Sequence, residues 1–204
     1  MNTRVLLFIA AWLISGCASS PSPTGSARAD PALSKGDQSY TAPPAPAPQS
    51  AYNEGVAAFQ AQDYAAARGH WERAAQDGSV AAKHNLAFLL FTGKGGQPSP
   101  ARAVELWREI SMRGHSEAQW HLGQAYELGK GTPRDLIEAY AWYRCAIAGA
   151  KVPIEEFPGL QEKVHRASSA SLASLRRKLS PDQFLPAEQL AEKYIQSYAL
   201  RKDT

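Results

Sequence analysis

The 204-residue chain lacks most features that would indicate a catalytic or nucleic-acid-binding protein. Its only cysteines are Cys17 and Cys145, so it has no disulfide framework. The formal net charge is only +3, without a dense lysine and arginine run, which leaves nucleic-acid binding without an electrostatic footprint. Zinc-protease, serine-hydrolase and phosphate-loop motifs are missing as well. We therefore predict no catalytic residue, no cofactor, no metal site and no nucleic-acid partner.

The first residues, by contrast, predict export and attachment to a lipid. Arg4 supplies a positive start, and residues 5–14 form a continuous apolar run. At ~1.5 Å per residue this run would be roughly 15 Å long, about half a bilayer core, which is typical of a signal peptide. The sequence Ile14-Ser15-Gly16-Cys17 resembles the lipobox of bacterial lipoproteins. That resemblance implies cleavage before Cys17 and acylation of its thiol; the alternative is an ordinary secretory signal with a chance cysteine.

The residues after Cys17 suggest where the protein is anchored and how it is spaced from the membrane. Ala18 and Ser19 follow directly, and the lack of an adjacent aspartate favours the outer membrane of a Gram-negative host, with the domain facing the periplasm. In a Gram-positive host the anchor would lie in the cell membrane. Residues 17–50 are rich in Pro, Ala and Ser without apolar periodicity, which predicts a disordered tether. A proline-rich docking motif is the alternative to a plain linker.

Small and aromatic residues recur in the middle of the chain at a fixed spacing of 36 residues. Such a period is typical of stacked helical repeats. Small side chains let two helices approach closely, and an aromatic residue four positions later lies on the same face and fills the next gap. The matching positions are Ala67, Ala103 and Ala139; Trp71, Trp107 and Tyr143; and the pairs Ala82 with Ala118, Leu86 with Leu122, Ala87 with Gly123, Gly93 with Gly129, and Gly95 with Gly131.

These patterns predict an all-α fold: a short α-solenoid of antiparallel helix hairpins with a C-terminal helical cap, preceded by the signal peptide and the tether. Ser180-Pro181 with Gln183, and Ser116 with Gln119, are expected to be helix-starting capping boxes. The expected helices span about 51–61, 64–77, 80–92, 99–113, 116–128, 135–149, 160–179 and 181–201. The predicted division is 1–16 signal peptide, 17–50 lipidated cysteine and tether, 51–150 repeats, and 151–204 cap.

The repeated residues resemble a known family. Asp63-Tyr64, Ala67, Trp71 and Ala74 are similar to the second half of a tetratricopeptide repeat, and the next two units carry four extra residues between their helices. The third unit is similar to the related Sel-1-like repeat, at Leu122-Gly123, Tyr126, Gly129-Lys130-Gly131, Asp135, Ala139 and Trp142-Tyr143. The resemblance covers residues 51–150 and implies a protein–protein interaction role. Gly93-Lys94-Gly95-Gly96 is interpreted as a repeat turn and not as a phosphate loop, because it has a counterpart in Gly129-Lys130-Gly131 and lacks the preceding strand and the Lys-Ser/Thr ending.

Stacked hairpins leave a concave face lined by the first helix of each unit. Aromatic side chains beside amides and an acid suit an extended peptide or a partner helix. The predicted partner-binding residues on this face are Tyr52, His84, Asn85, Phe88, Trp120, His121, Gln124 and Glu127. The equally weighted alternative is that Phe88 and Trp120 pack against the C-terminal cap, so that the cap fills the groove.

Two kinds of reactive side chain need a separate interpretation. His84 and His121 would lie about one repeat apart on one face, and a metal site there would need a third ligand, for which Glu127 is the nearest candidate. We interpret these histidines as partner-binding residues. Cys145 is interpreted as a buried small residue, with intermolecular pairing as the minor alternative.

Taken together, the sequence predicts a non-enzymatic envelope lipoprotein that acts as an adaptor or scaffold. Its partner would be a protein in a periplasmic or outer-membrane assembly, and its membrane contact would be the lipid at Cys17. The alternative function is a factor that binds or processes cell-wall fragments with weak hydrolase activity.

Overall fold

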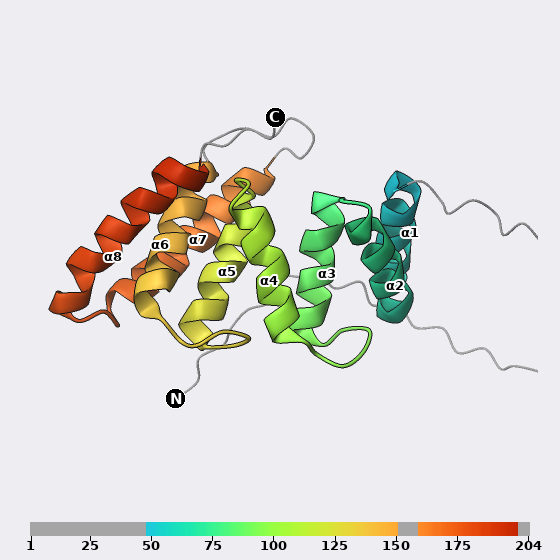
Figure 1. Ribbon diagram of the computed structural model, residues 1–204, viewed down its shortest axis with the longest axis horizontal. Coiled ribbons are helices and arrows are strands. Elements are labelled where there is room, and N and C mark those ends of the chain that lie inside the picture. Colours follow the sequence, from blue (N-terminus) through green and yellow to red (C-terminus); the bar gives the residue numbers. More distant parts are fainter. Residues whose placement is uncertain (1–47, 151–158, 200–204) are drawn as a thin grey trace, which may run out of the picture. The chain divides into compact units, whose positions relative to one another are not determined.

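The computed structural model describes residues 48–150 and 159–199 (Figure 1). These residues all belong to one compact unit. The predicted signal peptide, Cys17 and nearly all of the tether lie outside the described residues, so the lipid anchor stays a prediction. Among the described helices, none is both long and apolar enough to span a bilayer.

The described residues form eight α-helices and a final π-helical turn. In chain order they are α1 (Pro48–Gln60), α2 (Tyr64–Gln76), α3 (Val80–Thr92), α4 (Pro100–Ser111), α5 (Ser116–Leu128), α6 (Leu136–Gly149), α7 (Leu160–Arg176), α8 (Pro181–Tyr194) and η1 (Ile195–Ala199). The first six helices pair as the hairpins α1–α2, α3–α4 and α5–α6, and α7 and α8 pack against α6 (Figure 1). The predicted all-helical solenoid of hairpins with C-terminal helices against its last repeat is confirmed.

Small residues bring the helices of each hairpin together. Ala67, Ala103 and Ala139 are completely buried, as the 36-residue spacing predicts. Gly123 of α5 lies against the ring of Tyr143 in α6, where an added Cβ would be 2.7 Å from two ring carbons. The helix faces that the sequence assigned to the interior are therefore the faces that pack.

Of the two predicted capping boxes, one is confirmed and the other is wrong. Ser180 and Gln183 form the expected capping box at the start of α8. At α5, however, the predicted box of Ser116 and Gln119 is wrong. His115 is the N-cap, because its Nδ1 accepts the Ala118 N–H at 3.2 Å, and the Ser116 hydroxyl instead donates to Gln161 of α7 at 3.0 Å.

The glycine-rich turns of the second and third repeats, which join α3 to α4 and α5 to α6, pack against the preceding repeat. Gly95 (φ 76°) and Gly131 (φ 81°) adopt left-handed conformations that favour glycine. An added Cβ at Gly95 would strike the carbonyl of Tyr64, and one at Gly131 would strike the carbonyl of Pro100. Each turn therefore rests on the first residue of the second helix in the preceding repeat. The predicted identity of Gly93–Gly96 as a repeat turn is confirmed.

The C-terminal helices form a second apolar core with the last repeat. Tyr140 and Tyr143 of α6 are buried there with Leu175 of α7 and Ala187 and Ala191 of α8. The last predicted helix, 181–201, ends earlier as α-helix, at Tyr194, and continues as the π-helical turn. This turn carries Tyr198 onto the ring of Trp142, with centroids 5.8 Å apart.

Candidate binding groove and histidine cluster

An apolar groove of about 390 Å³ lies across the first two repeats. Its walls come from the first helix of each repeat, α1 and α3, and its floor comes from α2. The lining residues are Tyr52, Val56, Phe59, Gln60, Trp71, Asn85 and Phe88. A volume of this size falls in the ~300–1,000 Å³ range of sites that hold small molecules or a few side chains of a partner.

The groove is held in shape by Trp71. Gly55 of α1 leaves room for the indole, because any Cβ at that position would overlap the Trp71 ring. The indole N–H donates to the Tyr52 carbonyl at 3.3 Å, and the ring packs 5.5 Å from Phe59 between centroids. Because the floor is a buried and hydrogen-bonded ring, the groove is preformed.

One cation lies at the groove. The Nζ atom of Lys94, in the turn after α3, is 4.6 Å from the ring centroid of Tyr64 and 5.9 Å from those of Phe59 and Phe88. Within the described residues no carboxylate forms an ion pair with Lys94. The positive charge beside an apolar wall favours an acidic group on whatever occupies the groove.

The corresponding face of the third repeat is covered by the chain itself. The Trp120 indole N–H donates to the Ser171 hydroxyl of α7 at 3.2 Å. Glu127 accepts hydrogen bonds from the Tyr143 hydroxyl at 2.8 Å and from Lys178 Nζ at 2.6 Å. Of the two alternatives for the concave face, packing against the cap therefore describes Trp120, whereas Phe88 lines the open groove.

His84 does not lie on the surface where the sequence analysis placed it. It is 7% exposed, between the ring of His115 at 4.9 Å and the ring of His121 at 5.5 Å, measured between centroids. The prediction of an exposed His84 is wrong because α5 uses His115 as its N-cap, and that ring then stacks on His84. His121 in turn stacks on Trp107 at 4.8 Å.

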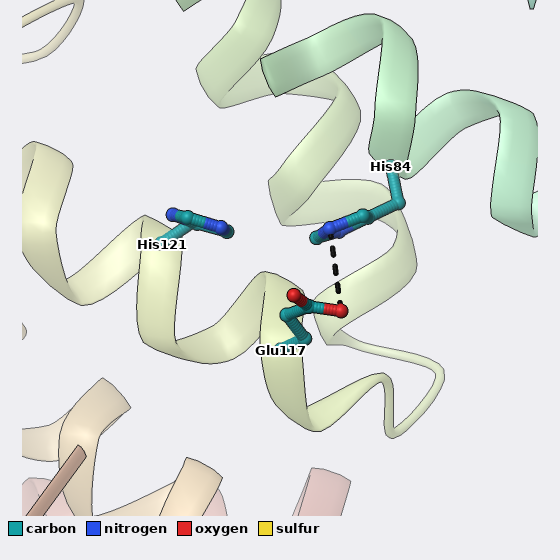
Figure 2. Close-up of side chains that lie close together, drawn as sticks. All are labelled: His84, Glu117 and His121. Atoms are coloured by element: carbon teal, nitrogen blue, oxygen red, sulfur yellow. Dashed lines mark ion pairs between the residues drawn. The ribbon is translucent and has the colours of Figure 1, made fainter. Parts of the chain in front are cut away.

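Figure 2 shows His84, Glu117 and His121 grouped together, from α3 and α5. Burial lowers the pKa of His84 to about 3, helped by the neighbouring His115. Burial also lowers the pKa of His121 to about 4, helped by His84. Both imidazoles are therefore neutral near pH 7, and the contact of 3.4 Å between His84 Nε2 and Glu117 Oε2 is not a salt bridge at that pH.

Sequence reasoning named the wrong carboxylate as the neighbour of the two histidines. Glu127 follows His121 by six residues, which places it on another face of α5, and its carboxylate is engaged by Tyr143 and Lys178. Glu117 precedes His121 by four residues and so shares its face. This four-residue spacing is the signal that could have identified Glu117.

The structure thus divides the predicted partner-binding residues into three groups. Tyr52, Asn85 and Phe88 line the groove. His84 and His121 belong to the cluster, with Gln124 Oε1 3.0 Å from His121 Nδ1. Trp120 and Glu127 contact the C-terminal segment. A role of these residues in partner binding stays a prediction.

Cys145 belongs to α6 and is buried in the protein core. Its Sγ lies 3.5 Å from the carbonyl oxygen of Tyr194, and the residue has no exposed surface. Burial raises the pKa of the thiol to about 12, which disfavours the thiolate required for nucleophilic attack. The interpretation of Cys145 as a buried small residue is confirmed.

Three consecutive segments match the family model of the Sel1 repeat, at residues 50–79, 80–115 and 116–150. The crystal structure of c5321, a protective antigen of uropathogenic Escherichia coli strains displaying an SLR fold, is similar with a TM-score of 0.64 and 25% identity, over 78% of this chain and 34% of that one. This chain therefore spans about a third of that antigen. A Sel1 repeat protein from Oxalobacter formigenes is 19% identical with a TM-score of 0.45, over 72% of this chain and 74% of that one. No curated protein matches the sequence.

Proposed function

Residues 50–150 of the chain belong to the Sel1 repeat family, and from that premise we propose that the protein is a non-enzymatic adaptor that holds a protein partner in the bacterial cell envelope. Sel1 repeat proteins generally mediate protein–protein interaction. The observation that carries the proposal for this chain is the preformed aromatic groove across α1 and α3, which no described segment of the chain covers.

The proposed occupant is an amphipathic helix of the partner with an acidic residue beside its apolar face. The third repeat supports this choice, because its corresponding face receives a helix, α7, through Trp120 and Ser171. A partner helix in the groove would repeat that arrangement one and two repeats earlier. Its apolar side chains would contact Val56 and Phe88, and its carboxylate would meet Lys94.

The envelope location is supported by the sequence outside the described residues. The apolar run at residues 5–14 and the lipobox-like segment ending in Cys17 are features of exported lipoproteins. In a Gram-negative host, Ala18 and Ser19 after the cysteine favour an outer-membrane anchor with the domain in the periplasm. In this proposal the tether lets the groove reach a partner at a distance from the membrane.

Site-specific photocrosslinking in living cells tests the groove. A photoreactive residue at Gln60, which is exposed and lines the groove, should crosslink to one discrete envelope protein. The matched control is the same residue at Glu105, which is exposed on α4 away from the groove. An identical crosslinking pattern from both positions, or none from Gln60, would refute a groove-bound partner.

Charge reversal tests the proposed acidic contact. Lys94→Glu should weaken partner capture by about ten-fold or more, because it replaces attraction by repulsion beside an apolar wall. Lys163→Glu, on the exposed face of α7, makes the same charge change elsewhere and should leave capture unchanged. Equal loss in both variants would mean that net charge, and not the groove, determines binding.

A further inference from the structure

Three potential metal ligands converge between the second and third repeats. The ligand atoms of His84, Glu117 and His121 all lie within 4.8 Å of one another, and Figure 2 shows the two rings and the carboxylate pointing into one space. Two imidazoles and one carboxylate are a ligand set that zinc accepts, with a fourth position for water. The groove of the proposed function is lined by other residues, so this observation is independent of that proposal.

The distances fit a zinc site that is nearly closed. Tetrahedral bonds of ~2.0–2.1 Å separate two ligand atoms by about 3.4 Å. His84 Nε2 and Glu117 Oε2 are 3.4 Å apart, which matches that edge and exceeds the ~2.7–3.2 Å of an ordinary hydrogen bond. The widest separation, up to 4.8 Å, must shorten by about 1.4 Å. Of the two ligands in the 3.4 Å contact, Glu117 has more room to move, because its side chain is 28% exposed and that of His84 is 9% exposed.

The buried ring of His84 also has bonding capacity that the protein does not use. Its Nδ1 atom has no hydrogen-bond partner within the described residues, although His84 is 93% buried. Leaving a buried polar atom without a partner costs about 1–3 kcal/mol, so such atoms in folded proteins call for an explanation. A cation on Nε2 would not itself satisfy Nδ1, but Nδ1 has no bond that fixes its protonation, so it can carry the ring proton and leave the Nε2 lone pair for a ligand beside Glu117.

His121 has the supporting contacts expected of a metal ligand. Its Nδ1 lies 3.0 Å from Gln124 Oε1, so Nδ1–H donates to the amide oxygen and the lone pair of the neutral ring lies on Nε2. The flat stacking on Trp107, with an interplanar angle of 11°, fixes the ring plane. Metal-bound histidines commonly donate their second ring N–H in this way.

We propose that His84, Glu117 and His121 bind one Zn²⁺ ion that clamps α3 of the second repeat to α5 of the third. Water would complete the coordination on the side where Glu117 is exposed. Because the ligands come from two repeats, the ion would couple their stability, and it would bind the folded chain in preference to the unfolded one. This inference goes beyond the adaptor function and does not depend on it.

The test is a zinc titration of the full-length protein, with a chromophoric chelator as competitor and thermal unfolding as a second readout. The wild type should bind one equivalent tightly, and zinc should raise its Tm. Glu117→Gln keeps the size of a partly exposed side chain but removes the charged ligand, so it should lower zinc affinity at least ten-fold and reduce the rise in Tm. His121→Gln should lower the affinity in the same way.

His70→Gln is the matched control. His70 Nδ1 and Glu54 Oε2 lie 2.8 Å apart, but the guanidinium of Arg73 is 3.8 Å from the same carboxylate oxygen and repels a cation. Zinc affinity and the Tm rise should therefore be unchanged in His70→Gln. The proposal is overturned if the wild type has no tight site, or if tight binding survives Glu117→Gln, as it would for zinc held by Cys17. Neither result would affect the crosslinking test of the groove.

Discussion

Replacing Gly123 by alanine measures how closely the helices of the third hairpin approach. The new Cβ would lie 2.7 Å from Cδ1 and Cε1 of Tyr143 and 3.3 Å from the carbonyl oxygen of Ala139. The Tyr143 ring is completely buried, so it cannot move aside into solvent, and its hydroxyl donates a hydrogen bond to Glu127. The added methyl must therefore displace a packed ring or separate two helices.

The expected change in the free energy of unfolding is the difference between a steric cost and a gain in helix propensity. Overpacking of a buried site costs roughly 1–3 kcal/mol. Alanine in place of glycine inside a helix gains about 1 kcal/mol. Gly123→Ala should therefore lower the free energy of unfolding by up to about 2 kcal/mol. Since urea slopes are about 1–3 kcal/mol per molar, the largest expected loss of about 2 kcal/mol would lower the midpoint of unfolding by roughly 0.7–2 M, depending on the slope.

Gly69→Ala isolates the steric part. Gly69 lies in the middle of α2 and is exposed to solvent, and an added Cβ there would meet nothing within 4 Å. The substitution should stabilise the protein by about 0.5–1 kcal/mol through helix propensity alone. Urea unfolding followed by circular dichroism gives both values. If Gly123→Ala stabilises as much as Gly69→Ala, the close packing of α5 on α6 is wrong.

Two further predictions concern the cysteines. The Cys145 thiol should resist alkylation in the native protein at pH 8 and react fully in denaturant, because it is buried and its pKa is raised to about 12; rapid labelling without unfolding would show that α6 is exposed to solvent. Cys17→Ala should abolish incorporation of labelled palmitate and leave the precursor uncleaved at that bond, and continued labelling would exclude Cys17 as the anchor.

The repeat pattern carried most of the information about the fold. Ala103 and Ala139 could be placed in the interior from the sequence because a helical period fixes which face a residue shares with its neighbours. The same logic located the glycine turns, since Gly95 and Gly131 recur at equal intervals. These features depend on local spacing, which a sequence displays directly.

Contacts between residues far apart in the sequence could not be predicted from the repeat spacing. The bond from Trp120 to Ser171 joins residues 51 positions apart, in a helix outside the repeat pattern. The burial of His84 depends on His115 acting as an N-cap, and serine at position 116 is the more usual capping residue. The sequence therefore predicted only part of the cluster: it placed His84 and His121 near each other, but it predicted neither the burial of His84 nor the position of Glu117 beside them.

The turns at Gly95 and Gly131 have a consequence for how specificity can change. In each turn, backbone atoms lie directly against backbone atoms of the preceding repeat. The angle between neighbouring hairpins is therefore set by the backbone, which does not change when side chains elsewhere are substituted. Substitutions at Asn85 or Val56 would then alter which ligand is recognised without altering the frame that presents them. An experimenter could redesign the lining residue by residue and expect neighbouring hairpins to keep the packing that these turns make.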